Sequence, residues 1–394
     1  MLTKCSNLIY ISFILSIVNL AIEPFTAFNY LDECIVLFLA IIGIINYHIY
    51  RNREFILVCS ILFLYLIYSL IINSNNINAI LLDFILTIKP FICFYIASHI
   101  DTNLSHKDTK KFMYISIGLG ITCWLYLPFI ETLYLNTASF YPFCISSAIA
   151  FLLFAPPNKN NKYIALLFLI PGLFSLRAKY YAEFIIFIYL YFFLHKRLKF
   201  SFKNIFIFCC LVGLIIYVNW NKFSFYFIDG YEHGAARTIM YYTSFQIFAD
   251  YFPFGCGYGT FGTEASARFY SPIYVEYDLH NIYGLRPEDY QTDNHFFSDT
   301  FYPILAQFGI IGVFLYIIFW FRIWAKGKFI LQLKKYRLFL FLFFTMAIQN
   351  IADITFMNKF SIPIMIAIGI LASPKKSKKE TILRYIRTIA KHQS

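Results

Sequence analysis

The chain has 394 residues, of which 60% are hydrophobic, 21% are aromatic and 14% are charged, and its formal net charge is +12. A water-soluble domain of ordinary composition cannot bury so much apolar surface, so the composition excludes a soluble protein and indicates an integral membrane protein. The basic residues gather in short segments between apolar runs, so the positive charge does not point to a nucleic-acid partner.

Apolar stretches long enough to cross about 30 Å of hydrocarbon recur from one end of the chain to the other. They lack the alternating pattern of barrel strands, which predicts an all-α, polytopic membrane protein with about 12 transmembrane helices. The expected spans are 6–22, 34–50, 55–72, 79–98, 112–130, 138–155, 163–176, 180–194, 204–219, 301–321, 337–352 and 356–373. No small-residue cleavage site follows the first span, so we expect it to be retained.

The distribution of lysine and arginine predicts the orientation of these spans. Most of the 33 basic residues fall in segments that share one side of the membrane when the spans alternate, and the positive-inside rule makes that side cytoplasmic. Both termini are then cytoplasmic. The expected parts are helices 1–9 in 1–219, a large extracytoplasmic loop at 220–300, helices 10–12 in 301–373 and a basic cytoplasmic tail at 374–394.

The stretch 163–194 is too long for one span, because at 1.5 Å per residue it would make a helix of about 48 Å. Pro171-Gly172 supplies a natural break. Two short spans therefore fit better, with Arg177 and Lys179 at or just beneath the outer surface.

Nine cysteines are present, but only Cys256 belongs to the large loop. A disulfide framework within that loop is therefore impossible, and no CxxC spacing indicates a metal site. We expect neither a metal nor a cofactor.

Within the loop, apolar side chains recur every three to four residues and predict an amphipathic helix lying against the membrane or against the helical bundle. These residues are Ile239, Tyr242, Phe245, Phe248 and Phe252.

The helix should end at Pro253, where a glycine-rich run begins. A formal GxGxxG follows at Gly257, Gly259 and Gly262, but no strand precedes it, which excludes a dinucleotide site. With Gly255, these glycines predict a turn that lets backbone pack closely, and direct contact with substrate is the alternative.

Several of these features resemble a known family. An arginine ahead of an amphipathic helix (Arg237), the run PFGCGYGTF (253–261), a polar stretch with His295 and a span opening on FGIIG (308–312) are similar to features of the O-antigen polymerase and O-antigen ligase superfamily. The segment SLRAKYYAE (175–183) is similar to the region where family members carry an arginine between two short spans.

The resemblance covers roughly 170–315 and implies glycosyl transfer at the outer face of the cytoplasmic (inner) membrane. The substrate would be an oligosaccharide repeat on polyprenyl diphosphate, from which a polymerase builds O-antigen, capsule or a similar surface polysaccharide. Membrane lipid, a chain-length regulator and a flippase would be its partners.

Such a transfer needs cations for the leaving diphosphate, and the planar fork of arginine suits phosphate oxygens. The candidates are Arg177, Arg237, Lys89 and Lys179. Lys89 lies near the middle of its span, where it could instead snorkel or bind a carbonyl freed by Pro90. Lys179 is one turn before Glu183, so an i,i+4 ion pair is the alternative account of both.

The attacking hydroxyl needs a proton acceptor, and His295 in DNHFFSD (293–299) matches the family position. Asp293 and Asp299 flank it and could orient or replace it. The alternative is a histidine that only holds the end of the loop in place.

Two other functions compete with a polymerase. An O-antigen ligase, which hands the glycan to a lipid A core, often has the order His-Asn where this chain has Asn294-His295. A flippase or transporter of lipid-linked sugars tends to have internal repeats and short loops, which the long loop argues against.

Overall fold

The computed structural model describes residues 2–22, 30–45, 52–100, 104–129, 137–198, 234–292, 294–297 and 299–373, together with single residues between 213 and 224. Within these ranges the chain is helical and contains no strand, which confirms the all-α prediction. Asp293, the tail at 374–394 and all but two residues of the expected span at 204–219 lie outside the described residues.

The helices of the first half lie close to the expected spans. Polar residues begin three of them, since Asn52, Asn76 and Ser105 each accept a backbone N–H of the first turn of α3, α4 and α5. The helices are α1 (Leu2–Ile22), α2 (Leu31–Ile45), α3 (Arg53–Ile71), α4 (Ile77–His99), α5 (His106–Tyr126) with the turn η3 (Leu127–Phe129), α6 (Thr137–Phe154), α7 (Asn161–Leu169) with η4 (Ile170–Ser175), and α8 (Ala178–Ile188) with the π turn η5 (Tyr189–Phe193).

The stretch 163–194 divides into two helical pieces. The break falls at Leu176, which adopts the left-handed conformation, and at Arg177, which is extended. Gly172 leaves room for Tyr180 to fold back, because a Cβ at this glycine would lie 2.3 Å from Tyr180 Cζ. The turn is therefore fixed by packing slightly downstream of the proline that predicted it.

The second half contains the insertion, a name we use for residues 220–300, and three apolar helices. The elements of the insertion are α11 (Ala236–Asp250), α12 (Glu264–Arg268), α13 (Pro272–Glu276), η6 (Leu279–Asn281) and α14 (Pro287–Gln291). They are followed by α15 (Phe301–Lys328), α16 (Leu333–Ala352), η7 (Thr355–Met357) and α17 (Ser361–Ala372).

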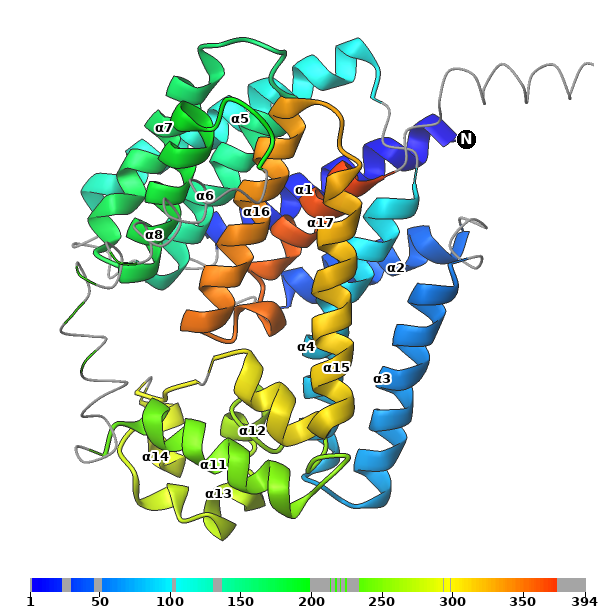
Figure 1. Cartoon of the computed structure of the whole chain (residues 1–394), viewed down its shortest axis with the longest axis vertical. Helices are drawn as coiled ribbons and strands as arrows, with labels where there is room; N and C mark the ends of the chain where they lie inside the picture. Colours follow the sequence, from blue (N-terminus) through cyan, green and yellow to red (C-terminus); the bar gives the residue numbers. More distant parts are fainter. Residues whose placement is uncertain are drawn as a thin grey trace, which may run out of the picture.

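α17 forms the centre of the bundle. Its side chains are buried on every face from Ser361 to Leu371, as expected for a helix that is apolar all round. It runs beside α4, where Gly369 lies so close that a Cβ would meet Ala97 at 2.7 Å. Figure 1 shows the helices α11 to α14 gathered at one end of the molecule, while α5, α6 and the start of α16 lie towards the other.

Among the described residues, four helices are long and apolar enough to cross a membrane, namely Arg53–Ile71, Ile77–His99, His106–Phe129 and Phe301–Lys328. Several of their apolar side chains are exposed, including Leu64, Tyr114 and Phe321. Because exposing such surface to water is unfavourable, these helices support a membrane protein.

Candidate functional site

The glycine-rich run of the insertion packs tightly against α3, α4 and α15. The Tyr68 hydroxyl donates to the Gly255 carbonyl at 2.9 Å, and the Gly257 N–H donates to the Gln307 carbonyl at 2.9 Å. At Gly259, where φ is +73°, a Cβ would lie 3.0 Å from the Ala79 carbonyl carbon. This geometry agrees with a turn that allows close backbone packing, and it fixes the insertion to the apolar helices.

Two further residues secure this contact. The Gly259 N–H donates to the buried carboxylate of Asp83 at 2.7 Å, and the Pro253 carbonyl accepts from Ile310 N–H at 3.1 Å at the kink of α15. Asp83 was not a candidate from the sequence, although a carboxylate within an apolar span signals a specific partner.

α11 turns its aromatic stripe outward. Tyr242 and Phe245 are 57% and 53% exposed, and Phe252, just beyond the end of α11, is 63% exposed, whereas the opposite face, with Met240 and Ile247, is buried. The sequence predicts that the stripe lies against the membrane or against the helical bundle. Among the described residues, the bundle contacts it through Phe248 and leaves the other aromatic side chains exposed. The buried face of α11 packs against α15, and this packing places the first turn of α11, with Arg237, near the start of α15.

Asp299, which lies just before α15, interacts with Tyr241 and with the charge of Arg237. The Tyr241 hydroxyl donates to Asp299 Oδ2 at 3.0 Å, and the charge of Arg237 acts on the same carboxylate. Tyr302 stacks on the Tyr241 ring at a centroid distance of 4.2 Å. The arginine predicted from the sequence thus lies within electrostatic range of one of the two predicted carboxylates.

Lys179 approaches this carboxylate from α8. Its ammonium group pairs with Asp353 at 3.1 Å, lies 5.3 Å from the centre of the Tyr141 ring, and acts electrostatically on Asp299. The alternative i,i+4 pair of Lys179 with Glu183 is wrong. Lys179 turns to Asp353 because the end of α16 packs against α8, while Glu183 faces the interior.

A buried hydrogen-bond network continues from this point into the bundle. Gln349 donates to Glu183 Oε1 at 2.8 Å and accepts from the Tyr141 hydroxyl at 3.2 Å. The hydroxyl of Thr300 donates to the Asp353 carbonyl at 3.0 Å, which joins the start of α15 to the end of α16.

These residues form one group, here called the polar cluster. It comprises Arg237, Tyr241 and Asp299 from the insertion, Lys179 and Glu183 from α8, Tyr141 from α6, and Gln349 and Asp353 from the end of α16. It lies where the insertion meets the apolar helices. Cations and carboxylates from distant parts of the sequence meet there, which is the combination needed to bind an anion and to accept a proton.

Burial raises the pKa of Asp299 to about 6, against the opposing effects of the Arg237 charge and the Tyr241 hydroxyl. The carboxylate is therefore mostly ionised at pH 7, yet it is a stronger base than an ordinary aspartate. A general base is most effective when its pKa lies near the working pH.

His295 lies in a different environment. Its ring is 5.1 Å from Phe297, 6.2 Å from Tyr290 and 6.4 Å from Tyr274, measured between ring centres. Neither ring nitrogen has a hydrogen-bond partner among the described residues, and burial lowers the pKa to about 4. The ring is thus neutral at pH 7 and is packed among aromatic side chains.

Lys89 belongs to a separate ion-pair group. It is 1% exposed and donates to Asp32 at 2.7 Å and also to Glu33, both in the first turn of α2. Two carboxylates therefore neutralise this charge inside the bundle. Arg177 is exposed at the N-cap of α8, close in sequence to Lys179, and Asp293 lies outside the described residues.

Sequence reasoning missed Gln349 and Asp353. The signal that could have revealed them is the polar pattern QNIAD (349–353) at the end of an otherwise apolar helix, since polar residues inside membrane segments are costly and usually have a specific partner.

In the part of the chain that the structure describes, no group of three His, Cys, Asp or Glu side chains is arranged to hold a metal ion. No protein-family model matches the chain, and no curated protein matches it at a significant level.

Proposed function

We propose that the chain is a membrane glycosyltransferase that polymerises polyprenyl-diphosphate-linked oligosaccharide repeats. The observation that supports this most directly is the polar cluster, in which Arg237 and Lys179 act on the same buried carboxylate, Asp299. The cluster lies at the end of the apolar helices, where a diphosphate anchored in lipid would meet a sugar hydroxyl.

The proposed topology has twelve spans, with both termini cytoplasmic and the insertion on the outer face of the cytoplasmic membrane. Basic residues in the connecting segments support this orientation. Reporters fused after Lys199 and Pro287 should read inside and outside, respectively. An outward signal at Lys199 would contradict the topology.

In the proposed reaction the hydroxyl of the incoming repeat attacks the anomeric carbon of the growing glycan. The new C–O bond forms as the bond to the diphosphate breaks, and Asp299 accepts the hydroxyl proton. The diphosphate leaves as an anion, and the positive charges of Arg237 and Lys179 stabilise it. Asp353 and Tyr141 hold Lys179 in position for this role.

The ion pairs of the cluster could instead serve only to attach the insertion to the bundle. The burial of Asp299 argues for a function. Its raised pKa means that the folded protein disfavours the ionised carboxylate, so the carboxylate is poorly suited to a purely structural ion pair. Tyr68 and Ser69 already attach the insertion through hydrogen bonds to the backbone groups of Gly255 and Tyr258.

The decisive experiment compares Arg237→Lys with Arg268→Lys in purified protein supplied with a lipid-linked repeat. A point charge cannot reproduce a two-pronged phosphate contact, so the first variant should lose about 10²–10³-fold in rate. Arg268 is exposed at the end of α12, against the Phe269 ring, and its variant should extend chains normally.

Product gels separate the proposed function from ligation. Loss of the gene should collapse a glycan ladder to a single repeat if the protein is a polymerase. Loss of all core-linked glycan would instead indicate a ligase, and normal product length from Arg237→Lys would remove this arginine from the site.

A further inference from the structure

A cavity of about 440 Å³ lies at the end of the molecule away from the insertion, where α5 and α16 begin and α6 ends. Its volume is within the range of about 300–1,000 Å³ that is usual for small-molecule sites. The polar cluster does not extend to this cavity, because none of its residues lines the cavity walls.

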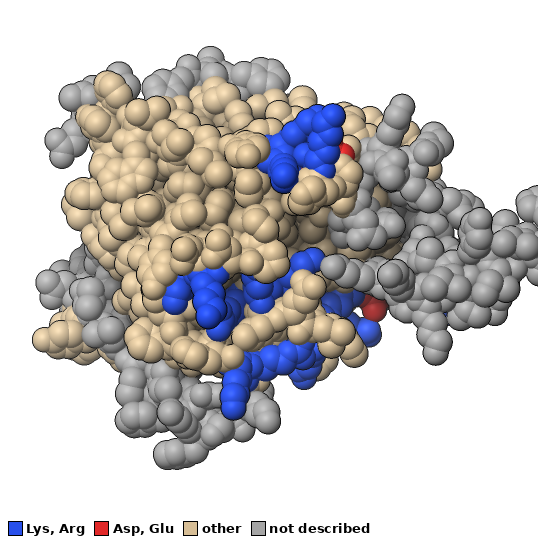
Figure 2. Space-filling model, turned by 90° about the horizontal axis from the view of Figure 1, so that it is seen from above, with Lys and Arg blue, Asp and Glu red and all other residues tan. Residues whose placement is uncertain are grey.

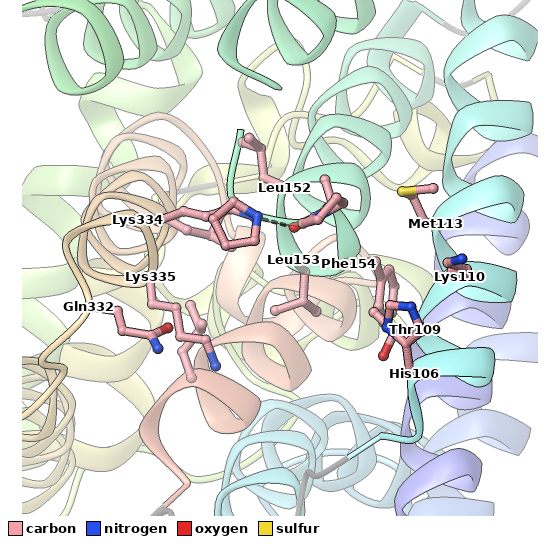
Figure 3. Close-up of a pocket in the computed structure, with 15 residues that line it drawn as sticks. His106, Thr109, Lys110, Met113, Leu152, Leu153, Phe154, Gln332, Lys334 and Lys335 are labelled. Carbon is pink, nitrogen blue, oxygen red and sulfur yellow. Dashed lines mark hydrogen bonds between the residues drawn. The ribbon is translucent and has the colours of Figure 1, made fainter. Parts of the chain in front are cut away.

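Lysine side chains border the cavity on two sides. Figure 3 shows Lys334 and Lys335 on the α16 side and Lys110, together with His106, on the α5 side. None of the described residues that line it is an aspartate or a glutamate. Figure 2 shows the same face from above, with Lys and Arg side chains gathered on it and little acidic surface among them.

The start of α16 adds to this positive potential. The first N–H groups of a helix carry partial positive charge, and Gln332 at the N-cap makes no side-chain capping hydrogen bond among the described residues. The Lys334 ammonium group binds the Ala155 carbonyl at the end of α6, which holds it at the edge of the cavity.

The remaining wall is apolar and is formed largely by the end of α6, with contributions from the neighbouring helices. Its side chains are Leu152, Leu153, Phe154, Met113, Leu338 and Leu371. A soluble anion would gain nothing from such a wall. A ligand with an anionic head and an apolar chain would match both halves of the lining.

We propose that this cavity binds an anionic phospholipid, with its phosphate between the lysines of α5 and α16 and the start of an acyl chain along α6. Basic pockets between membrane helices are a general mode of anionic-lipid recognition. The lysine ammonium groups would donate to the phosphate oxygens, and the leucine side chains would exclude water from the ester region. This site is separate from the proposed transfer reaction and does not depend on it.

The test uses the full-length protein purified in detergent and native mass spectrometry with phosphatidylglycerol or phosphatidylcholine of the same acyl chains. Phosphatidylglycerol should bind saturably and phosphatidylcholine weakly. Lys110→Ala with Lys335→Ala should weaken phosphatidylglycerol binding about 30-fold, the effect of two basic residues near an anionic group.

The matched control is Lys107→Ala with Lys111→Ala, which removes the same charge from the same end of the molecule at positions that do not line the cavity. Its lipid affinity should be unchanged. An equal loss in the control would show diffuse attraction and overturn the proposal. Equal binding of phosphatidylcholine would do the same.

A competition experiment and a single variant complete the test. Inorganic phosphate at matched concentration should not displace phosphatidylglycerol, and displacement would identify a soluble anion as the ligand. If the double variant does not elute as a single species, Lys110→Ala alone changes an exposed side chain and should weaken binding about fivefold. An unchanged affinity in that variant would contradict the site.

Discussion

Replacing Asp299 by asparagine should stabilise the folded protein at neutral pH while it removes the proposed transfer activity. Burial raises the pKa of this carboxyl from 3.8 to about 6, although the Arg237 charge and the Tyr241 hydroxyl oppose the shift. Ionisation is therefore more costly in the folded state than in the unfolded state. Asparagine carries no charge and keeps an oxygen for the Tyr241 hydroxyl, which now donates to Asp299 at 3.0 Å.

The size of the effect follows from the two pKa values. At pH 7.5, where both states are ionised, the difference between 3.8 and about 6 corresponds to a penalty of about 3 kcal/mol on the folded state. As the pH falls below 6 the folded state takes up the proton first, and the penalty declines to about 1 kcal/mol at pH 4.5. The penalty disappears below the pKa of the unfolded state, so the stability advantage of Asp299→Asn should decrease in acid.

The assay is thermal unfolding of the purified protein in detergent at pH 7.5 and pH 4.5, paired with the chain-extension gel. Asp289→Asn is the comparison, because Asp289 accepts the backbone N–H groups of Gly284 and Arg286 at 2.7 and 2.9 Å. Asparagine keeps an oxygen for these two N–H groups but loses the negative charge that strengthens both hydrogen bonds, so stability should fall by about 1–3 kcal/mol.

A lower Tm for Asp299→Asn at pH 7.5 would refute the reasoning, as would a difference that does not change with pH. Either result would mean that the carboxylate is a structural tie for Arg237 and Tyr241. Full activity in this variant would exclude Asp299 as the base, since a general base usually contributes about 10²–10⁴-fold.

Three other outcomes are expected. The rate of the proposed transfer should fall in acid with a midpoint near pH 6 if Asp299 is the base, because its carboxylate accepts a proton only when ionised, whereas a midpoint near pH 4 would assign the base to His295. Gly259→Ala should destabilise the protein by about 1–3 kcal/mol because of its positive φ and the nearby Ala79 backbone. Gly118→Ala, with open space around it in α5, should be neutral or stabilising by up to about 1 kcal/mol, and equal melting curves for the two variants would contradict this account. Chain extension should withstand EDTA, because in the proposed reaction Arg237 and Lys179 supply the positive charge, and activity that is lost in EDTA and restored by a metal would overturn that assignment.

The positions of the described helices could largely be predicted from sequence, because a run of about 20 apolar residues has few alternatives in a membrane. Helix ends were harder. α15 continues to Lys328, past the expected end at 321, because its charged residues still find partners: Arg322 pairs with Glu54 at 2.9 Å, and Lys326 lies 5.0 Å from the centre of the Phe94 ring. Hydropathy marks where the apolar segment stops, whereas local contacts decide where the helix stops.

The candidate site was only half predictable. Arg237 could be singled out from its place ahead of an amphipathic helix, Lys179 from its place between two short spans, and Asp299 from its position next to His295 in DNHFFSD. That these residues lie together could not be predicted, because the partner of Lys179, Asp353, is 174 positions away in sequence. Local spacing instead favoured Glu183 as the partner, and that prediction failed because tertiary packing overrode an i,i+4 pair of modest energy.

The location of the charges also bears on the choice between a transferase and a transporter. Transporters bind their substrates near the bilayer midplane, at sites formed by interrupted helices. The described charge nearest to the middle of α4 is Lys89, and Asp32 and Glu33 neutralise it. The polar cluster, by contrast, lies at the ends of helices, where Asp299 precedes α15 and Asp353 follows α16. A group that must pass through the bundle would gain little from cations placed there. A diphosphate that stays in the membrane while its sugar reacts at the surface would meet them directly, which favours transfer over transport.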